Sequence, residues 1–403
     1  MFKDKLISES MWNKYLLNVL NKDFISNEEK EEIKEFVDNK KYTNIVNNIY
    51  SNNYTFTTPI KHLINKRYNT KKRIVYTYSM DEMQLLKYIA FLLYNYDYLF
   101  SKNLYSFRKT IGVKQAINSL LHTKNIKNMY GYKLDIKNYF NSIDINILIN
   151  NLEHDIKDID LLNLFKELLN NKYVIYNNER ILESKGAIAG SPISAFLANF
   201  YLKEVDNYFW NQNVFYIRYA DDIIIFTNTK EELENYRKIL INYLHEYKLE
   251  VNKDKEHFYK PGELFEFLGF SFFGNTIDVS ENTLKKIKSK IKRSVRAYNR
   301  WMKKNNIKKE TVLKTIINKY NKKFYGIDNS ELSWQYWFFP TINTSKSLKI
   351  IDNYFQNQLR FMITSKHNKK NYKVVPYTFL KECHYKPLVH EYYELKFNMK
   401  NKV

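Results

Sequence analysis

The segment FYIRYADDIIIF, residues 215–226, contains two apolar runs separated by a short polar break. FYIRY and IIIF have the aromatic and β-branched composition of strands, and only three residues lie between them. We therefore predict a tight β-hairpin that carries two acids, Asp221 and Asp222, at its tip. Adjacent carboxylates repel each other and are costly to bury, so a cation is their natural counter-charge.

A third acid lies at the end of another short strand. GYKLDI, residues 131–136, reads as a strand that ends at Asp135. One interpretation makes Asp135 a simple strand-end cap, and the other groups it with Asp221 and Asp222. Ligand sets made only of oxygen select Mg²⁺ or Mn²⁺. Three carboxylates and a substrate triphosphate can hold two such ions about 3.5–4 Å apart, a geometry that serves in-line phosphoryl transfer.

The segment KGAIAGSPISAFLANFYL, residues 185–202, reads as a glycine-containing loop that leads into a helix. Gly186, Gly190 and Pro192 shape the loop, and Ser191 or Ser194 stands near the start of the helix. Backbone amides at such a junction suit close approach to a nucleotide. A plain loop-to-helix connection has the same pattern, so both interpretations stay open.

Composition narrows the class of protein. The 403 residues carry a net charge of +22, which indicates a polyanionic partner such as nucleic acid; the alternative is a solvated basic surface. The single cysteine, Cys383, excludes a disulfide framework. The charged N-terminus and the absence of a long apolar run predict a cytoplasmic protein without a membrane partner.

Three further segments read as helices. Residues 1–50 and 230–248 are amphipathic, and residues 81–100 read as an apolar helix capped at Asp81. FEFLGFSFF, residues 265–273, is expected to be a strand that pairs with a neighbour around Gly274.

A basic segment follows the last of these strands. Residues 285–323 hold sixteen Lys or Arg and one acid. Four aromatic residues are interleaved at near-helical spacing: Tyr298, Trp301, Tyr320 and Phe324. This favours a groove that follows a phosphate backbone, and the alternative is a solvated helix surface over a buried aromatic seam.

Taken in order, these motifs resemble those of the reverse transcriptases, specifically the bacterial retroelement-derived group. The resemblance covers about residues 60–275. LDIKNYFNSI, GAIAGSPIS and IRYADDIIIF are similar to the first three catalytic motifs of the family. LEVNKDKEHF and FEFLGFSF resemble the fourth motif and the primer-grip hairpin, while SFRKTIGVKQAINSL and KKRIVYTYS resemble motifs of the fingers.

The resemblance implies an α+β right-hand polymerase, with fingers and palm built from antiparallel sheet and helices and with a helical, thumb-like C-terminal region. The implied divisions are an N-terminal helical region (1–53), fingers (54–130), a palm (131–280) with a fingers insertion at about 145–185, and a basic thumb with its C-terminal extension (281–403).

The resemblance also assigns roles to single residues. Asp135, Asp221, Asp222 and the carbonyl of Ile136 would bind two Mg²⁺ ions, with Mn²⁺ as an alternative. Lys255 would protonate pyrophosphate, with a solvated lysine as the alternative. Phe140 would be the steric gate that excludes a 2′-hydroxyl, with a core aromatic as the alternative. The remaining nucleotide contacts would be Lys71, Arg73, Arg108, Ala189 and Gly190, with template contact as the alternative for Arg108. The template and primer contacts would be Tyr219, Ser191, Lys292, Arg293, Arg296 and Arg300.

One motif departs from the family pattern. Most relatives have Gln where this chain has Ala189, and the Gln helps to position the incoming nucleotide. The departure favours the divergent defence-associated and abortive-infection reverse transcriptases. We therefore expect an RNA-directed DNA polymerase of a bacterial antiphage system, which uses dNTPs and an RNA template or non-coding RNA and makes DNA. The expected protein partners are a second copy or a second defence protein. The alternatives are a protein-primed or template-independent DNA synthase and a catalytically silent RNA-binding scaffold.

Overall fold

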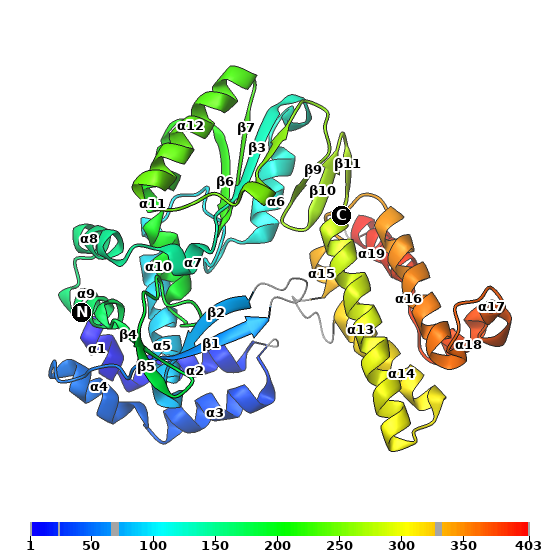
Figure 1. Ribbon diagram of the computed structural model, residues 1–403, viewed down its shortest axis with the longest axis horizontal. Helices are drawn as coiled ribbons and strands as arrows, with labels where there is room; N and C mark the ends of the chain where they lie inside the picture. The colour runs from blue at the N-terminus through cyan, green and yellow to red at the C-terminus, as the bar shows by residue number, and fades with distance from the viewer. Residues whose placement is uncertain (1, 23–24, 66–71, 327–332, 402–403) are drawn as a thin grey trace. The chain divides into compact units, whose positions relative to one another are not determined.

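The structure is a computed structural model that describes residues 2–22, 25–65, 72–326 and 333–401. The chain forms two compact units, residues 1–261 and 262–403 (Figure 1). None of the helices in these described ranges is long and apolar enough to cross a membrane.

Unit 1 combines helices with two four-stranded sheets. Its α-helices are α1 (Phe2–Ile7), α2 (Glu9–Leu20), α3 (Asn27–Asp38), α4 (Tyr42–Tyr50), α5 (Met80–Leu93), α6 (Val113–His122), α7 (Tyr139–Ser142), α8 (Ile145–Asp155), α9 (Ile159–Asn170), α10 (Ser194–Tyr201), α11 (Lys203–Asn211) and α12 (Lys230–Glu246). Its 3₁₀ helices are η1 (Tyr94–Leu99), η2 (Ile126–Asn128) and η3 (Lys253–Lys255).

The first sheet has the order β6-β7-β3-β8 and is antiparallel throughout. Its strands are β3 (Tyr130–Asp135), β6 (Phe215–Tyr219), β7 (Asp222–Thr227) and β8 (His257–Tyr259). β7 is central, and Ile223, Ile224 and Ile225 are all buried, so its continuous apolar run is that of a strand covered on both faces. Helix α12, which begins in a Thr229–Glu232 capping box, packs against β3 and β7 (Figure 1).

The second sheet has the order β2-β1-β4-β5. Its strands are β1 (Ile60–Asn65), β2 (Lys72–Thr77), β4 (Tyr173–Tyr176) and β5 (Glu179–Leu182). Two antiparallel hairpins meet in it through one parallel pair, Ile60 with Ile175. Residues 115 positions apart are thus joined in one sheet, which sequence periodicity could not predict.

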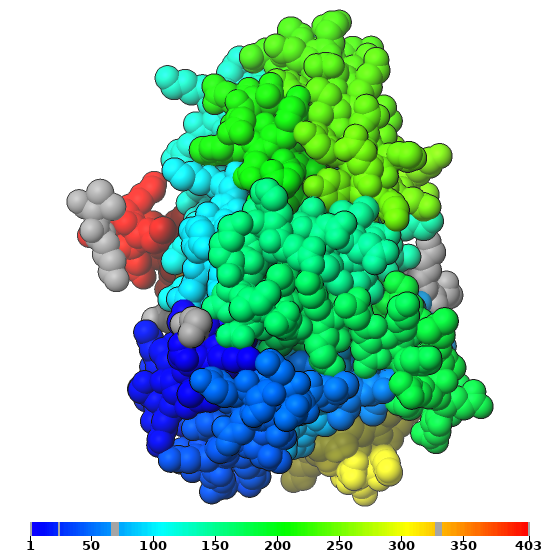
Figure 2. Space-filling view, turned by 90° about the vertical axis from the view of Figure 1, so that its left-hand side faces the viewer, coloured from blue at the N-terminus to red at the C-terminus, as the bar shows by residue number. Residues whose placement is uncertain are grey.

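The N-terminal helices pack against the rest of unit 1. The backbone N–H of Phe2 donates to Asp158 Oδ2 at 2.7 Å, and Trp12 stacks on Tyr88 of α5. Figure 2 shows the blue N-terminal helices lying against the green α8–α9 segment. The predicted helical region at residues 1–50 is therefore present, and it belongs to the core of unit 1.

Unit 2 begins with a three-stranded antiparallel sheet and continues as helices. Its elements are β9 (Phe265–Phe267), β10 (Phe270–Phe273), β11 (Thr276–Val279), α13 (Glu281–Asn305), α14 (Lys309–Tyr325), α15 (Trp334–Trp337), α16 (Lys346–Thr364), α17 (Asn371–Val374), α18 (Tyr377–Glu382) and α19 (Leu388–Lys400). Helices α13, α14 and α16 pack on one another, and the buried stripe of α13 is Ile287, Ile291 and Val295. The predicted fold class, antiparallel sheets with helices and a helical C-terminal region, is confirmed.

Two local predictions were wrong. The helix expected at 81–100 begins at Met80, because Ser79 rather than Asp81 is the N-cap and forms a capping box with Glu82. The segment 265–273 is two strands rather than one. Leu268 and Gly269 both have positive φ, which makes the two-residue turn of a hairpin. The expected pairing around Gly274 is present between β10 and β11.

Candidate active site

The three predicted acids meet at one end of the first sheet, where β3 ends and β7 begins. Asp135, the last residue of β3, lies directly opposite Asp222, the first residue of β7. Asp221 stands on the two-residue turn before β7, and its carbonyl oxygen accepts a hydrogen bond from the N–H of Ile136 at 3.0 Å. Three acids from two distant segments are thus held on adjoining backbone.

Burial makes this group of acids electrostatically unfavourable. Burial, together with the carboxylates of Asp135 and Asp222, raises the pKa of Asp221 to about 6. Burial also raises the pKa of Asp222, and Lys133 opposes this shift. Lys133 Nζ lies 3.7 Å from Asp222 Oδ1. The site therefore holds excess negative charge that a cation would stabilise.

Lys255, at the end of η3, supplies a second ammonium group. Its Nζ lies 2.6 Å from Asp135 Oδ1, and its side chain is 58% exposed. Burial acts to lower the pKa of Lys255, but the hydrogen bond to Asp135 and the charges of Asp221 and Asp222 raise it. Lys255 thus remains protonated and reaches solvent beside the carboxylates.

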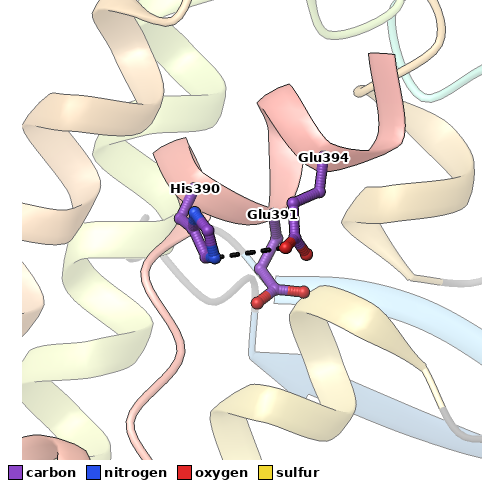
Figure 3. A group of neighbouring side chains, drawn as sticks. All are labelled: His390, Glu391 and Glu394. Carbon is purple, nitrogen blue, oxygen red and sulfur yellow. Dashed lines mark ion pairs between the residues drawn. The ribbon is translucent and has the colours of Figure 1, made fainter. Parts of the chain in front are cut away.

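The donor set fits Mg²⁺ or Mn²⁺, because every side-chain donor is a carboxylate oxygen. The oxygens of the three acids do not all lie within 4.8 Å of one another. In the described residues that criterion is met by His390, Glu391 and Glu394 of α19 (Figure 3). There His390 Nε2 and Glu394 Oε1 form an exposed i,i+4 pair at 3.3 Å, which is ordinary surface pairing on a helix.

Phe140 lies in α7, five residues beyond Asp135. Its ring is half-buried and meets Phe107 edge-on, with centroids 6.1 Å apart. The carbonyl of Phe140 accepts from Ala187 N at 2.8 Å, and a Cβ at Gly186 would lie 2.2 Å from that oxygen. Glycine at 186 therefore allows the loop to approach the backbone of the predicted gate.

The loop after Gly186 attaches to β2. Tyr76 N donates to the carbonyl of Ala189 at 2.7 Å. Gly190 has φ +103°, and a Cβ there would lie 2.8 Å from the carbonyl oxygen of Tyr76. Ser191 is buried, and its Oγ has no hydrogen-bond partner among the described residues. The structure thus brings Ala189, Gly190 and Ser191 to the edge of the predicted fingers strand.

The predicted basic contacts of the fingers differ in availability. Arg73 is exposed on β2, and Lys71 lies outside the described residues. The side chain of Arg108 is 8% exposed, and all five of its N–H donors are used. Three of them bond to Asp97, at its two carboxylate oxygens and its carbonyl oxygen. The other two bond to the carbonyl oxygens of Ser101 and Leu104. In this conformation Arg108 has no free donor for a triphosphate, so its geometry is that of a structural residue.

The basic residues of α13 have the exposure that phosphate contacts need. Lys292, Arg293, Arg296 and Arg300 are all exposed, on the side of the helix away from its buried stripe. Of the interleaved aromatics, Tyr320 and Phe324 are buried, as the aromatic-seam interpretation expects, whereas Trp301 is 42% exposed.

Sequence reasoning missed three residues beside the acids. Phe107 is 45% exposed, and its ring contacts those of Phe140 and Tyr219. Tyr219 is half-buried, and its ring centroid lies 6.4 Å from that of Phe107. Ser106 and Arg218 are fully buried and bond to the backbone of Ala220. The position of Arg218 inside the apolar strand FYIRY was the one sequence signal of a buried ion pair. No sequence signal indicated the role of Ser106.

The chain is similar in sequence to two curated proteins over part of its length. The chain is 32% identical over 141 residues to the Retron Ec73 reverse transcriptase of Escherichia coli, covering 31% of this chain and 40% of that protein. It is 30% identical over 119 residues to a COX1/OXI3 intron 2 protein of Saccharomyces cerevisiae, covering 29% and 14%. The chain therefore spans less than half the length of either curated relative.

The chain also aligns with solved structures. Apo telomerase from Candida tropicalis aligns over 86% of this chain and 64% of its own, with a TM-score of 0.48 and 13% identity. The model of the family "Reverse transcriptase (RNA-dependent DNA polymerase)" matches residues 64–272, more than half of the chain and the whole of the acidic site. On that match, this chain belongs to the reverse transcriptase family.

Proposed function

We propose that the protein is an RNA-directed DNA polymerase that adds dNTPs to a 3′-hydroxyl. The observation that carries the proposal is the register of Asp135 with Asp222, with Asp221 on the adjoining turn. Membership of the reverse transcriptase family supports it.

Each residue then has a chemical task. Asp135, Asp221, Asp222 and the carbonyl of Ile136 would hold two divalent cations, which when bound supply Lewis-acid activation of the 3′-hydroxyl and charge stabilisation of pyrophosphate. Lys255 holds a proton at Nζ beside Asp135 and can give it to the leaving pyrophosphate. Phe140 lies under the incoming sugar and excludes a 2′-hydroxyl.

Our proposal for the biological setting rests on the sequence. The departure at Ala189 favours the defence-associated group, so we place the enzyme in a bacterial antiphage system with a non-coding RNA. The net charge of +22 and the exposed basic face of α13 suit an RNA partner. A protein-primed or template-independent DNA synthase is the second candidate. Ala189 favours it, because its methyl group cannot make the hydrogen bond of the usual Gln.

The test is nucleotide incorporation by purified protein with Mg²⁺ or Mn²⁺. Three reactions separate the candidates: an RNA template with a DNA primer, protein and dNTPs alone, and the second reaction followed by proteinase. RNA-dependent extension supports the leading proposal. Product that forms without template and becomes free only after proteinase supports protein priming. If the protein purifies with RNA and binds it but incorporates no nucleotide in any of the three reactions, the result would support a catalytically silent RNA-binding scaffold.

A further inference from the structure

The turn between β6 and β7 contains only Ala220 and Asp221, since Tyr219 pairs directly with Asp222. Ala220 has φ +58°, in the left-handed region. For a residue with a Cβ this conformation is sterically unfavourable. The turn that presents Asp221 is therefore strained and must be held by its surroundings.

Both backbone polar groups of Ala220 are held by buried side chains. Its N–H donates to Ser106 Oγ at 2.8 Å, and its carbonyl oxygen accepts from Arg218 Nη1 at 3.4 Å. Ser106 and Arg218 are both 0% exposed. The two contacts therefore hold the peptide units on either side of Ala220, one through its N–H and the other through its carbonyl oxygen.

Ser106 is itself fixed. Its hydroxyl lies 3.0 Å from Asn199 Oδ1, to which it donates, while Asn199 Nδ2 donates to the carbonyl of Ser106 at 2.7 Å. A hydroxyl has one proton, so this bond leaves the lone pairs of Oγ for the N–H of Ala220. The hydrogen-bond roles at the turn are thereby determined.

Arg218 is fixed by a buried ion pair. Its Nε and Nη2 lie 2.8 and 2.5 Å from the two carboxylate oxygens of Asp206, and Tyr216 also donates to Asp206 at 3.0 Å. Asp206 and Arg218 are both fully buried. Replacement of a buried ion pair by well-packed apolar residues of similar volume often leaves a fold equally stable or more stable. Stability is therefore a weak reason for this pair, and orientation of the turn supplies a specific one.

We propose that Ser106 and Arg218 are positioning residues, which hold Ala220 in its strained conformation and so direct the carboxylate of Asp221 into the divalent-cation site. The inference rests on the proposed function for the identity of that site. It concerns residues that touch neither substrate nor cation, and they act through the turn backbone.

The test measures Mn²⁺ binding by electron paramagnetic resonance, without nucleotide, on four proteins: wild type, Ser106→Ala, Ala220→Gly and the double variant. We expect Ser106→Ala to weaken Mn²⁺ binding at least fivefold, because the turn relaxes. Glycine adopts positive φ without strain, so Ala220→Gly should restore most of the affinity in the Ser106→Ala background. A merely structural serine would not be rescued in this way.

Ser347→Ala is the matched control, since it removes another buried hydroxyl, one that donates to the carbonyl of Val279 at 3.4 Å. It should leave Mn²⁺ affinity unchanged. Arg218→Lys keeps the charge but loses the planar fork, and it should weaken binding in the same direction as Ser106→Ala.

Three results overturn the inference: no Mn²⁺ binding by the wild type, wild-type affinity in folded Ser106→Ala, or weakened affinity that Ala220→Gly does not restore. Incorporation assays on the same proteins separate the two proposals. If the wild type incorporates no nucleotide while the Mn²⁺ pattern appears as expected, the proposed function fails and the positioning role stands.

Discussion

Asp135 and Asp222 are paired residues of adjacent antiparallel strands, so their Cα atoms are neighbours although 87 positions separate them in the chain. Such pairing puts both side chains on the same face of the sheet. Two carboxylates held in this way cannot separate without breaking the β3–β7 ladder. The repulsion between them is therefore built into the fold, and a bound cation would relieve it.

We expect Asp222→Asn to abolish nucleotide incorporation while the fold is kept, because a two-cation site that loses one carboxylate loses several kcal/mol of transition-state stabilisation. Asp221→Asn should do the same. Primer extension and thermal melting on the same preparations measure both effects. Asp254→Asn, which changes the same charge at an exposed position of η3, should retain activity. Near-normal incorporation by both site variants would falsify the assignment.

Without divalent cations, Asp221→Asn should raise thermal stability in a pH-dependent way. The pKa of Asp221 is about 6 in the folded protein, above its ordinary value of 3.8. Ionised Asp221 therefore destabilises the fold, by at most about 3 kcal/mol, and this cost grows as pH rises from about 4 to 6.

Melting of both proteins in EDTA at pH 4.5 and 7.5 checks this expectation. The advantage of the Asn variant should be large at pH 7.5 and small at pH 4.5. An advantage that is equal at the two pH values would mean that the pKa of Asp221 is not raised.

Phe140→Ala should raise the ratio of ribonucleotide to deoxyribonucleotide incorporation at least tenfold, about 1.4 kcal/mol of discrimination. The gain comes from a lost steric clash, so it should appear mainly as improved use of rNTPs. Steady-state kinetics with dGTP and GTP measure the ratio. Phe107→Ala, which removes the ring packed against the gate, should shift it in the same direction by less. An unchanged ratio in active Phe140→Ala would make Phe140 a core residue.

Reversal of four charges on α13 should weaken RNA binding and flatten its salt dependence. Each lost phosphate contact removes about 0.7–0.9 from the slope of log affinity against log salt. The variant carries Glu at Lys292, Arg293, Arg296 and Arg300, all of them exposed.

Filter binding at several salt concentrations gives the slope. A variant with four exposed lysines of unit 1 reversed is the control for net charge, with Glu at Lys14, Lys34, Lys157 and Lys238. It should keep the slope closer to that of the wild type. If the two variants lower the slope equally, α13 is only a solvated surface.

The local elements of the site could be predicted from the order of the residues alone. FYIRYADDIIIF had to be a hairpin, because two strand-forming runs are separated by too few residues for any other connection, and β6 and β7 form it. Asp135, Asp221 and Asp222 were identified because acids at strand ends are costly without a cation. The apolar and polar periodicity of α12 and α13 likewise required amphipathic helices.

The surroundings of those acids, in contrast, depend on how distant segments pack in the folded protein. The hydrogen bond from Ala220 to Ser106 joins residues 114 positions apart. The five donors of Arg108 bond to the carboxylate of Asp97 and to three carbonyl oxygens, and no pattern in the sequence indicates these partners. The pairing of β1 with β4 is equally non-local. Local patterns report the backbone hydrogen bonds and the side-chain faces of one segment. The partner of a buried polar group is fixed by packing between segments, and that is settled only when the chain has folded.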